Sequence, residues 1–177
     1  MCSGYLLNVM NTNKLEQIVK DISEFLSSQC IDFNSIAARG LSGTLVSSPV
    51  CIATGKSIVV VRKGESTHGY EVEADVCPSR YIIIDDFIDT GATIKAIINR
   101  ISGLYIGTKC VGVVLYQQYI HDIDDQGIVF FDTSFVDDAK IAELVVEDAY
   151  RIKSRKQVDG SELKTTIYKR SGANHND

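Results

Sequence analysis

Apolar side chains recur along this chain with two spacings, one typical of helices and the other of buried strands. Near the N-terminus they are spaced three or four positions apart, at Leu15, Ile18, Val19, Ile22, Phe25 and Leu26. This spacing predicts an amphipathic helix, and residues 13–16 (Asn-Lys-Leu-Glu) resemble a capping box at its start. Further helices are predicted over 42–53, where Pro49 makes the helix irregular, over 92–101 and over 139–150.

Short apolar runs between these helices predict β-strands. They cover residues 35–38, 57–61, 81–84, 110–116 and 128–131. Because strands alternate with helices, we predict an α/β fold with an open, mostly parallel sheet and helices on both faces. The polar segment 66–80 contains Gly69 and Pro78 and breaks the alternation, so we expect either a mobile loop or a small hairpin there.

Length and composition are those of a globular protein. The 177 residues suit a single domain, 1–177, with an N-terminal helical segment (1–30) and a basic C-terminal tail (151–177). No apolar run is long enough to span a membrane, and the first residues lack the features of a signal peptide. The five cysteines are scattered, with no Cys-x-x-Cys pair, which favours reduced thiols over disulfides or zinc. We therefore expect a cytoplasmic protein with no membrane partner.

Charge is distributed unevenly. The net charge of −5 argues against a general nucleic-acid-binding surface. Residues 151–177 contain seven Lys/Arg and three Asp/Glu, so the tail carries +4 and residues 1–150 carry −9. Such a tail either contacts a phosphate or a partner or is a solvated end, and the sequence favours the solvated end.

The most informative segment is 81–94, Tyr-Ile-Ile-Ile-Asp-Asp-Phe-Ile-Asp-Thr-Gly-Ala-Thr-Ile. A buried strand ends at Asp85 and Asp86, at the edge where open α/β sheets bind ligands. Residues 89–93 then offer backbone N–H groups, two hydroxyls and a helix N-terminus, all suited to a phosphate. A sugar phosphate fits both parts of the segment, because its hydroxyls can bind the carboxylates and its phosphate can bind the loop. The alternative interpretation is a strand that ends in solvated carboxylates before an ordinary helix cap.

Two other segments place cations at strand ends. Residues 37–43, Ala-Ala-Arg-Gly-Leu-Ser-Gly, combine Arg39 with two glycines that let an anion approach the backbone. Residues 61–69, Val-Arg-Lys-Gly-Glu-Ser-Thr-His-Gly, place Arg62 and Lys63 directly after a strand. Taken singly, each segment is also consistent with an ordinary polar loop.

Together the three segments resemble the type I phosphoribosyltransferases, in the order that family shows and over about residues 30–116. Segment 81–94 resembles the motif that binds phosphoribosyl diphosphate (PRPP). Segment 37–43 is similar to the pyrophosphate loop of adenine phosphoribosyltransferases, and 61–69 to the catalytic loop of orotate phosphoribosyltransferases, except that Ser66 stands where that family has a lysine. This departure puts full catalytic competence in question.

The resemblance implies an enzyme that transfers a phosphoribosyl group from PRPP to a nucleobase, with Mg²⁺ bound mainly through PRPP and no metal site of its own. It also implies a homodimer and a lid over residues 62–78. The implied catalytic residues are Asp89, Lys63, Arg62 and His68. The implied substrate-binding residues are Asp85, Asp86, Asp89, Thr90, Gly91, Ala92, Thr93, Arg39, Gly40, Arg62 and Lys63.

The sequence does not define which nucleobase is accepted, and it leaves alternative functions open. Tyr116, Gln117 and Gln118 occupy the position of the purine-binding lysine of hypoxanthine-guanine enzymes, so the base, of orotate or purine type, is not defined. Phe130, Phe131 and Phe135 are candidates for stacking on it, although such aromatic residues usually belong to the core. The alternative function is a non-catalytic PRPP- or nucleotide-binding regulatory protein, and a third is an interaction protein with a decayed site. Residues 121–125 are acidic and are predicted to form a solvated turn.

Overall fold

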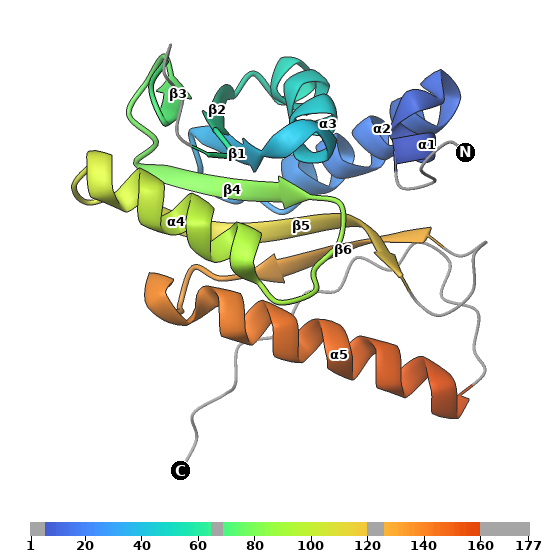
Figure 1. The fold of residues 1–177 in the computed structure, drawn as a ribbon. Coiled ribbons are helices and arrows are strands. Elements are labelled where there is room, and N and C mark those ends of the chain that lie inside the picture. The colour runs from blue at the N-terminus through green and yellow to red at the C-terminus, as the bar shows by residue number, and fades with distance from the viewer. Residues whose placement is uncertain (1–5, 65–68, 120–125, 160–177) are drawn as a thin grey trace.

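The structure is a computed structural model that describes residues 6–64, 69–119 and 126–159. Its elements in chain order are α1 (Leu7–Met10), α2 (Thr12–Ser28), β1 (Ser35–Arg39), α3 (Gly40–Thr54), β2 (Ser57–Val61), β3 (Val72–Ala74), β4 (Arg80–Asp85), α4 (Ala92–Leu104), β5 (Lys109–Tyr119), β6 (Gln126–Asp132), the short 3-10 helix η2 (Asp138–Lys140) and α5 (Ile141–Asp159). Figure 1 shows the strands in one open sheet, with the helices packed around it.

Within the described residues the strands form a six-stranded sheet in the order β3-β2-β1-β4-β5-β6. The four central strands are parallel, with β1 paired to both β2 and β4, and β4 paired to β5. The two outer strands, β3 and β6, are antiparallel to their neighbours. The predicted α/β class with an open, mostly parallel sheet is confirmed.

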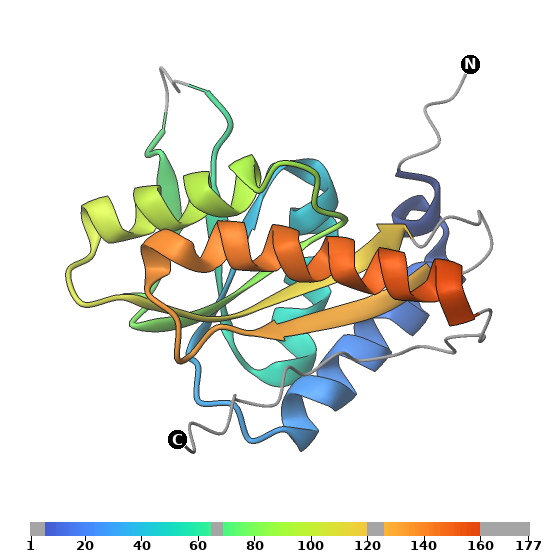
Figure 2. The same cartoon turned by 90° about the horizontal axis from the view of Figure 1, so that it is seen from below.

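Each face of the sheet carries its own apolar core. Helices α4 and α5 cover one face, where Ile97, Ile101 and Val145 are fully buried. Helices α2 and α3 cover the other, where Ile22 and Val46 are fully buried. The views in Figures 1 and 2 agree on this two-sided arrangement. Because both faces are covered, the central strands are apolar at successive positions, as parallel strands usually are.

Several predicted helix boundaries are wrong. Helix α2 begins at Thr12 and its cap is Asn11, whose Oδ1 accepts a hydrogen bond of 3.1 Å from the backbone N–H of Lys14, so 13–16 is not the capping box. Helix α3 starts at Gly40 and continues through Pro49 without a break.

The last helix also differs from its predicted extent. Helix α5 continues to Asp159, nine residues beyond the predicted end at 150. Arg151 supports this extension by pairing with Glu147 and Asp148 on the preceding turn. In the described part of the chain, no helix is both long and apolar enough to cross a membrane.

The segment 66–80, expected to be a loop or a hairpin, contains the edge strand β3. Val72 of β3 pairs with Val61 of β2, and the backbone N–H of Arg62 donates to the carbonyl of Glu71 at 2.9 Å. The hairpin alternative is therefore confirmed. Ser66, His68, the acidic turn 121–125 and the tail beyond 159 lie outside the described residues.

Candidate functional site

Two adjacent carboxylates lie at the carboxyl end of β4, a central strand of the sheet. Asp85 is the last residue of β4 and Asp86 follows it, each only 6% exposed. The backbone N–H of Asp86 donates to Oδ1 of Asp85 at 3.1 Å, and the backbone N–H of Gln117 donates to the carbonyl of Asp86 at 2.7 Å. The end of β5 therefore fixes the acidic pair at the carboxyl edge of the sheet.

Burial controls the protonation of Asp85. Removal from water, followed by the nearby negative charge of Asp86, raises the pKa of Asp85 to about 8, although the positive charge of Lys63 opposes the shift. The folded protein consequently keeps a proton on Asp85 at neutral pH. A ligand that needs both carboxylates ionised must displace this proton.

A short loop joins the acidic pair to helix α4. Gly91 is the N-cap of α4 and has a φ of +74°, in the left-handed region that glycine adopts readily. The space beside its Cα is closed by α5, since a Cβ there would lie 3.1 Å from Cγ2 of Val146 and 3.2 Å from the carbonyl oxygen of Ala142. The hydroxyl of Thr90 accepts from the backbone N–H of Ala92 at 3.4 Å. The start of α4 is thus held against α5, with its backbone donors at the sheet edge.

The opposite wall is basic. Strand β1 ends at Arg39, and α3 begins at once with Gly40, whose φ is +81°. A Cβ on Gly40 would lie 2.7 Å from Cε and 2.8 Å from Nζ of Lys63, so the lysine lies across the start of α3. The left-handed φ favours glycine here, and a side chain would in addition have to move the flexible end of Lys63.

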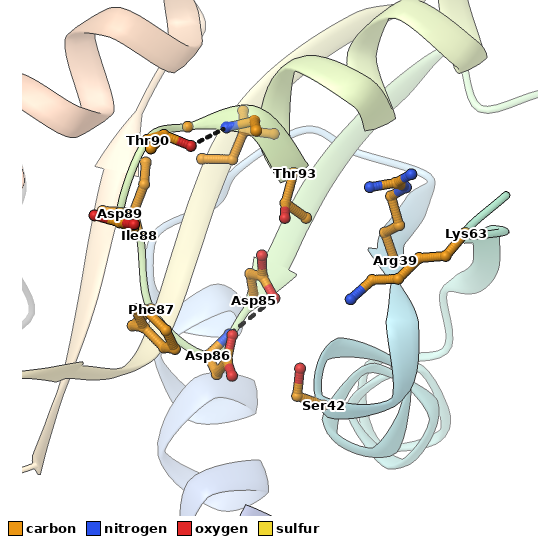
Figure 3. A pocket seen from close by; sticks show the side chains of 13 residues that line it. Arg39, Ser42, Lys63, Asp85, Asp86, Phe87, Ile88, Asp89, Thr90 and Thr93 are labelled. Atoms are coloured by element: carbon orange, nitrogen blue, oxygen red, sulfur yellow. Dashed lines mark hydrogen bonds between the residues drawn. The ribbon is translucent and has the colours of Figure 1, made fainter. Parts of the chain in front are cut away.

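These two walls and the acidic pair enclose one cleft of about 370 Å³. It is lined by Arg39, Ser42, Lys63, Asp85, Asp86, Phe87, Ile88, Asp89, Thr90, Gly91, Ala92, Thr93 and Ile94. Figure 3 shows the carboxylates between the α4 loop on one side and the two basic side chains on the other. Such an arrangement suits a ligand with hydroxyl groups at its centre and anionic groups at both ends.

The structure brings most of the predicted site residues together. From Asp85 to Thr93, every residue expected to bind substrate lines the cleft, and Arg39 and Lys63 do so as well. Gly40 lies beside it under Lys63. Arg62 does not line the cleft: its Nε and Nη2 donate to Oε1 of Glu73 at 3.1 and 2.8 Å. His68 lies outside the described residues.

None of the aromatic candidates for base stacking lines the cleft. Phe130 and Phe131 are each 1% exposed and belong to the two cores, with Phe130 against Phe25 at a ring-centroid distance of 5.0 Å. They are not available to a ligand, and the alternative that they belong to the core is confirmed. Phe135 is exposed, but it does not line the cleft. The aromatic ring that does line it is that of Phe87, for which no role was predicted from the sequence.

Three further lining residues were not predicted from the sequence, namely Ser42, Ile88 and Ile94. A signal existed for each. Ser42 belongs to the Gly-rich segment 37–43, and Ile88 lies inside the motif at 81–94. Ile94 is the last residue of that motif, and its apolar side chain is typical of a core position. It is in fact 1% exposed.

Comparison with solved structures shows which fold carries this site. Orotate phosphoribosyltransferase from Mycobacterium tuberculosis, in complex with Fe(III) dicitrate, matches with a TM-score of 0.53 and 16% identity, over 80% of this chain and 70% of that one. A phosphoribosyltransferase from Corynebacterium diphtheriae matches with a TM-score of 0.51 and 18% identity, over 60% and 62% of the two chains. This chain has the type I phosphoribosyltransferase fold.

The likeness is in three-dimensional structure. The M. tuberculosis enzyme in complex with inorganic phosphate matches with a TM-score of 0.50 and 18% identity, over 60% of this chain and 58% of that one. Our chain therefore covers less than two thirds of the length of that enzyme. No protein-family model and no curated protein sequence matches.

Proposed function

We propose that the protein binds PRPP in the cleft and transfers its phosphoribosyl group to a nucleobase, with release of pyrophosphate. The observation that carries the proposal is that the acidic pair, the α4 loop and two basic side chains open into one cleft. The phosphoribosyltransferase fold supports it. In this proposal the ribose hydroxyls donate to Asp86 and Asp85, the 5-phosphate binds at residues 89–93, and the diphosphate binds near Arg39 and Lys63.

The reaction breaks the bond between ribose C1 and the diphosphate oxygen, and the electron pair leaves with pyrophosphate. A nitrogen of the base supplies the pair for the new bond to C1 and loses its proton, for which Asp89 is the proposed acceptor. Positive charge develops on the ribose ring while negative charge develops on the leaving group. Lys63 and Arg39 are placed to stabilise the leaving diphosphate.

We propose that Mg²⁺ enters with PRPP and supplies further positive charge on the diphosphate. The donor set fits this role, because Asp85 and Asp86 provide adjacent carboxylate oxygens, the ligand type that Mg²⁺ prefers. No group of three or more His, Cys, Asp or Glu side chains in the described residues is arranged to hold a metal ion. The substrate phosphates would therefore complete the coordination.

The proposal extends to the hairpin and to assembly. The segment 62–78, which includes β3, would cover the cleft during the reaction and limit the access of water. A homodimer is the expected assembly, and sedimentation velocity of the full chain measures it directly. A monomer at micromolar concentration would contradict the dimer without affecting the proposed chemistry.

Pyrophosphate release tests the enzymatic proposal. Full-length protein, PRPP and Mg²⁺ are incubated with a panel of orotate, uracil and purine bases, and pyrophosphate and the nucleotide product are both quantified. We expect release that depends on one class of base. PRPP binding without release for any base would instead favour the regulatory PRPP-binding protein. That alternative has one specific observation in its favour, because Arg62 is bound to Glu73 away from the cleft.

A further inference from the structure

The outer edge of β6 is buried, although no described strand pairs with it. Strand β6 is the last strand of the sheet and pairs with β5 alone among the described strands. Its residues 128–131 are nevertheless each at most 4% exposed. At the opposite edge of the sheet, Glu73 and Ala74 of β3 are only half-buried. Part of the chain therefore covers the edge of β6 in a way that the edge of β3 is not covered.

The groups that need a cover are on the backbone. The N–H of Thr133 donates to the carbonyl of Val111 at 3.2 Å, so Thr133 faces β5. Because residues alternate in an antiparallel ladder, Ile128, Phe130 and Asp132 direct their N–H and C=O groups away from β5. Buried backbone groups of this kind almost always have hydrogen-bond partners. A further segment that lies along this edge would supply them.

The helices on the two faces of the sheet do not supply these partners. Phe130 packs against Phe25 of α2, with ring centroids 5.0 Å apart, and Phe131 belongs to the core beneath α4 and α5. These contacts bury side chains. The backbone groups inside a helix bond within that helix, so neither α2 nor α5 offers a row of backbone partners to β6.

The sequence of β6 also calls for a cover. Residues 128–131 are Ile-Val-Phe-Phe, an uncharged β-branched and aromatic run without proline. An open edge of this kind pairs readily with another chain and promotes aggregation. Strand β3 needs less protection, because it has three residues and carries the charge of Glu73.

The length of the chain indicates which segment covers β6. Four stretches lie outside the described residues: 1–5, 65–68, 120–125 and 160–177. Only 160–177 is longer than the seven residues of β6. Figures 1 and 2 both show that α5 ends at the end of the sheet where β6 begins, so the chain that leaves Asp159 starts beside this strand. Within it, residues 163–168 are Leu-Lys-Thr-Thr-Ile-Tyr, a composition that suits an extended segment on an apolar edge.

We infer that residues 160–177 lie along the outer edge of β6, with 163–168 over Ile128 and Phe130. In this position the tail blocks edge-to-edge pairing between copies of the protein. The burial of β6 thus favours a contact for this tail, whereas its sequence favoured a solvated end. The inference does not depend on the proposed function, because no residue of β6 lines the cleft.

Hydrogen exchange of the full chain, followed by NMR one amide at a time, tests the inference. In the wild type, the amides of 163–168 are expected to exchange at least about tenfold more slowly than those of 171–176, which belong to the same tail. Nuclear Overhauser effects are expected between 163–168 and the amides of Ile128 or Phe130. Neither measurement needs a variant.

The variant Leu163→Asp/Ile167→Asp then places two charges against the apolar edge. It is expected to speed exchange at Ile128 and Phe130 by about tenfold or more, because the tail is released. Val129 and Phe131 face β5 and are expected to keep their protection, which also shows that the sheet stays folded. Ala173→Asp/Asn174→Asp is the matched control, since it adds the same charges near the chain end and is expected to change none of these rates.

Three results would overturn the inference. The first is a wild-type tail whose amides all exchange at the rate of an unstructured peptide. The second is the absence of Overhauser effects between 163–168 and β6. The third is a folded Leu163→Asp/Ile167→Asp variant in which Ile128 and Phe130 keep their protection, because side chains of α2 and α5 would then close the edge. If this variant does not fold, the two wild-type measurements decide.

Discussion

At the scale of single residues, the buried carboxyl of Asp85 makes the free energy of unfolding depend on pH. Because the pKa of Asp85 is raised to about 8, the folded protein holds this proton up to that pH, whereas an unfolded chain loses it near 3.8, the ordinary pKa of an aspartate. Between these two values the folded state binds more protons than the unfolded state, so raising the pH lowers stability. We predict a loss of several kcal/mol between pH 5 and pH 8, on the scale of about 1.4 kcal/mol per pKa unit.

Urea unfolding of the wild type and of Asp85→Asn at pH 5, 6.5 and 8 measures this effect. The asparagine variant has no carboxyl to ionise at this position, so its stability is expected to fall much less with pH. Identical pH profiles for the two proteins would contradict the assignment. The same proton predicts that PRPP binding releases protons near pH 7, which calorimetry detects as a dependence of the binding heat on the ionisation enthalpy of the buffer.

The residues of the site show what sequence alone could and could not predict. The carboxylates and the phosphate loop were predictable because they are contiguous at a strand end, so a local pattern fixes their relative positions. The pairing of Arg62 with Glu73 could not be predicted from the sequence. It depends on the antiparallel pairing of β3 with β2 and on the register of that pairing, which brings the two residues together. The position of Ser42 in the cleft was hidden for a similar reason, because it depends on the long-range pairing of β1 with β4.

At the scale of secondary-structure elements, the β2–β3 hairpin controls the availability of Arg62. Neutralising the partner in Glu73→Gln weakens the pair and frees the guanidinium for the diphosphate. We predict that the variant binds magnesium pyrophosphate about two- to fivefold more tightly, the range expected for an exposed ion pair. Glu71→Gln is the matched control, since it removes the carboxylate that pairs with Arg100 on α4 and leaves Arg62–Glu73 in place.

The double variant Arg62→Ala/Glu73→Gln separates this effect from a general change in surface charge. If Arg62 binds the diphosphate, the gain from Glu73→Gln disappears when Arg62 is absent. A gain that persists in the double variant, or one of equal size in Glu71→Gln, would show that Arg62 is not the group released. Calorimetric affinities of the variants give the answer directly.

The junction between the phosphate loop and α5 is a second point at element scale. Gly91→Ala places a Cβ against Ala142 and Val146 in a left-handed conformation. We predict a loss of roughly 1–2 kcal/mol in the free energy of unfolding together with weaker ribose 5-phosphate binding, because the start of α4 must shift. Gly103→Ala in the same helix is the control, since a Cβ there meets nothing within 4 Å. Equal effects of the two substitutions on ribose 5-phosphate affinity would contradict the close contact.

The elements also differ in how well they could be predicted from their sequences. Strand β4 was predicted almost to its ends because it is a continuous β-branched run covered on both faces. Strand β3 has three residues at an edge of the sheet, of which only Val72 is buried, so no periodic pattern marks it. Helix α3 was expected to be irregular, but a proline removes a single hydrogen bond, and the buried contacts of Val46 and Val50 hold the helix together on both sides of Pro49.

At the scale of the whole molecule, the site depends on the order of the strands. Strands β1 and β4 are adjacent and parallel although β2 and β3 separate them in the sequence, so the carboxyl ends of both meet at one edge. This topology brings Arg39 and the start of α3 to face the acidic pair. Alternation of strands and helices predicted the class of fold, but the adjacency of β1 and β4 is a long-range property that no local pattern in the chain specifies.

The central claim is that this edge of the sheet binds PRPP. Calorimetric titration of the full chain with PRPP in the presence of Mg²⁺ tests it most directly, with Asp86→Ala as the site variant and Asp75→Ala, an exposed carboxylate outside the cleft, as the control. We predict one saturable site per chain, lost in Asp86→Ala and retained in Asp75→Ala, with both variants folded. Wild-type protein that does not bind PRPP, or an Asp86→Ala variant that binds it with unchanged affinity, would contradict the account.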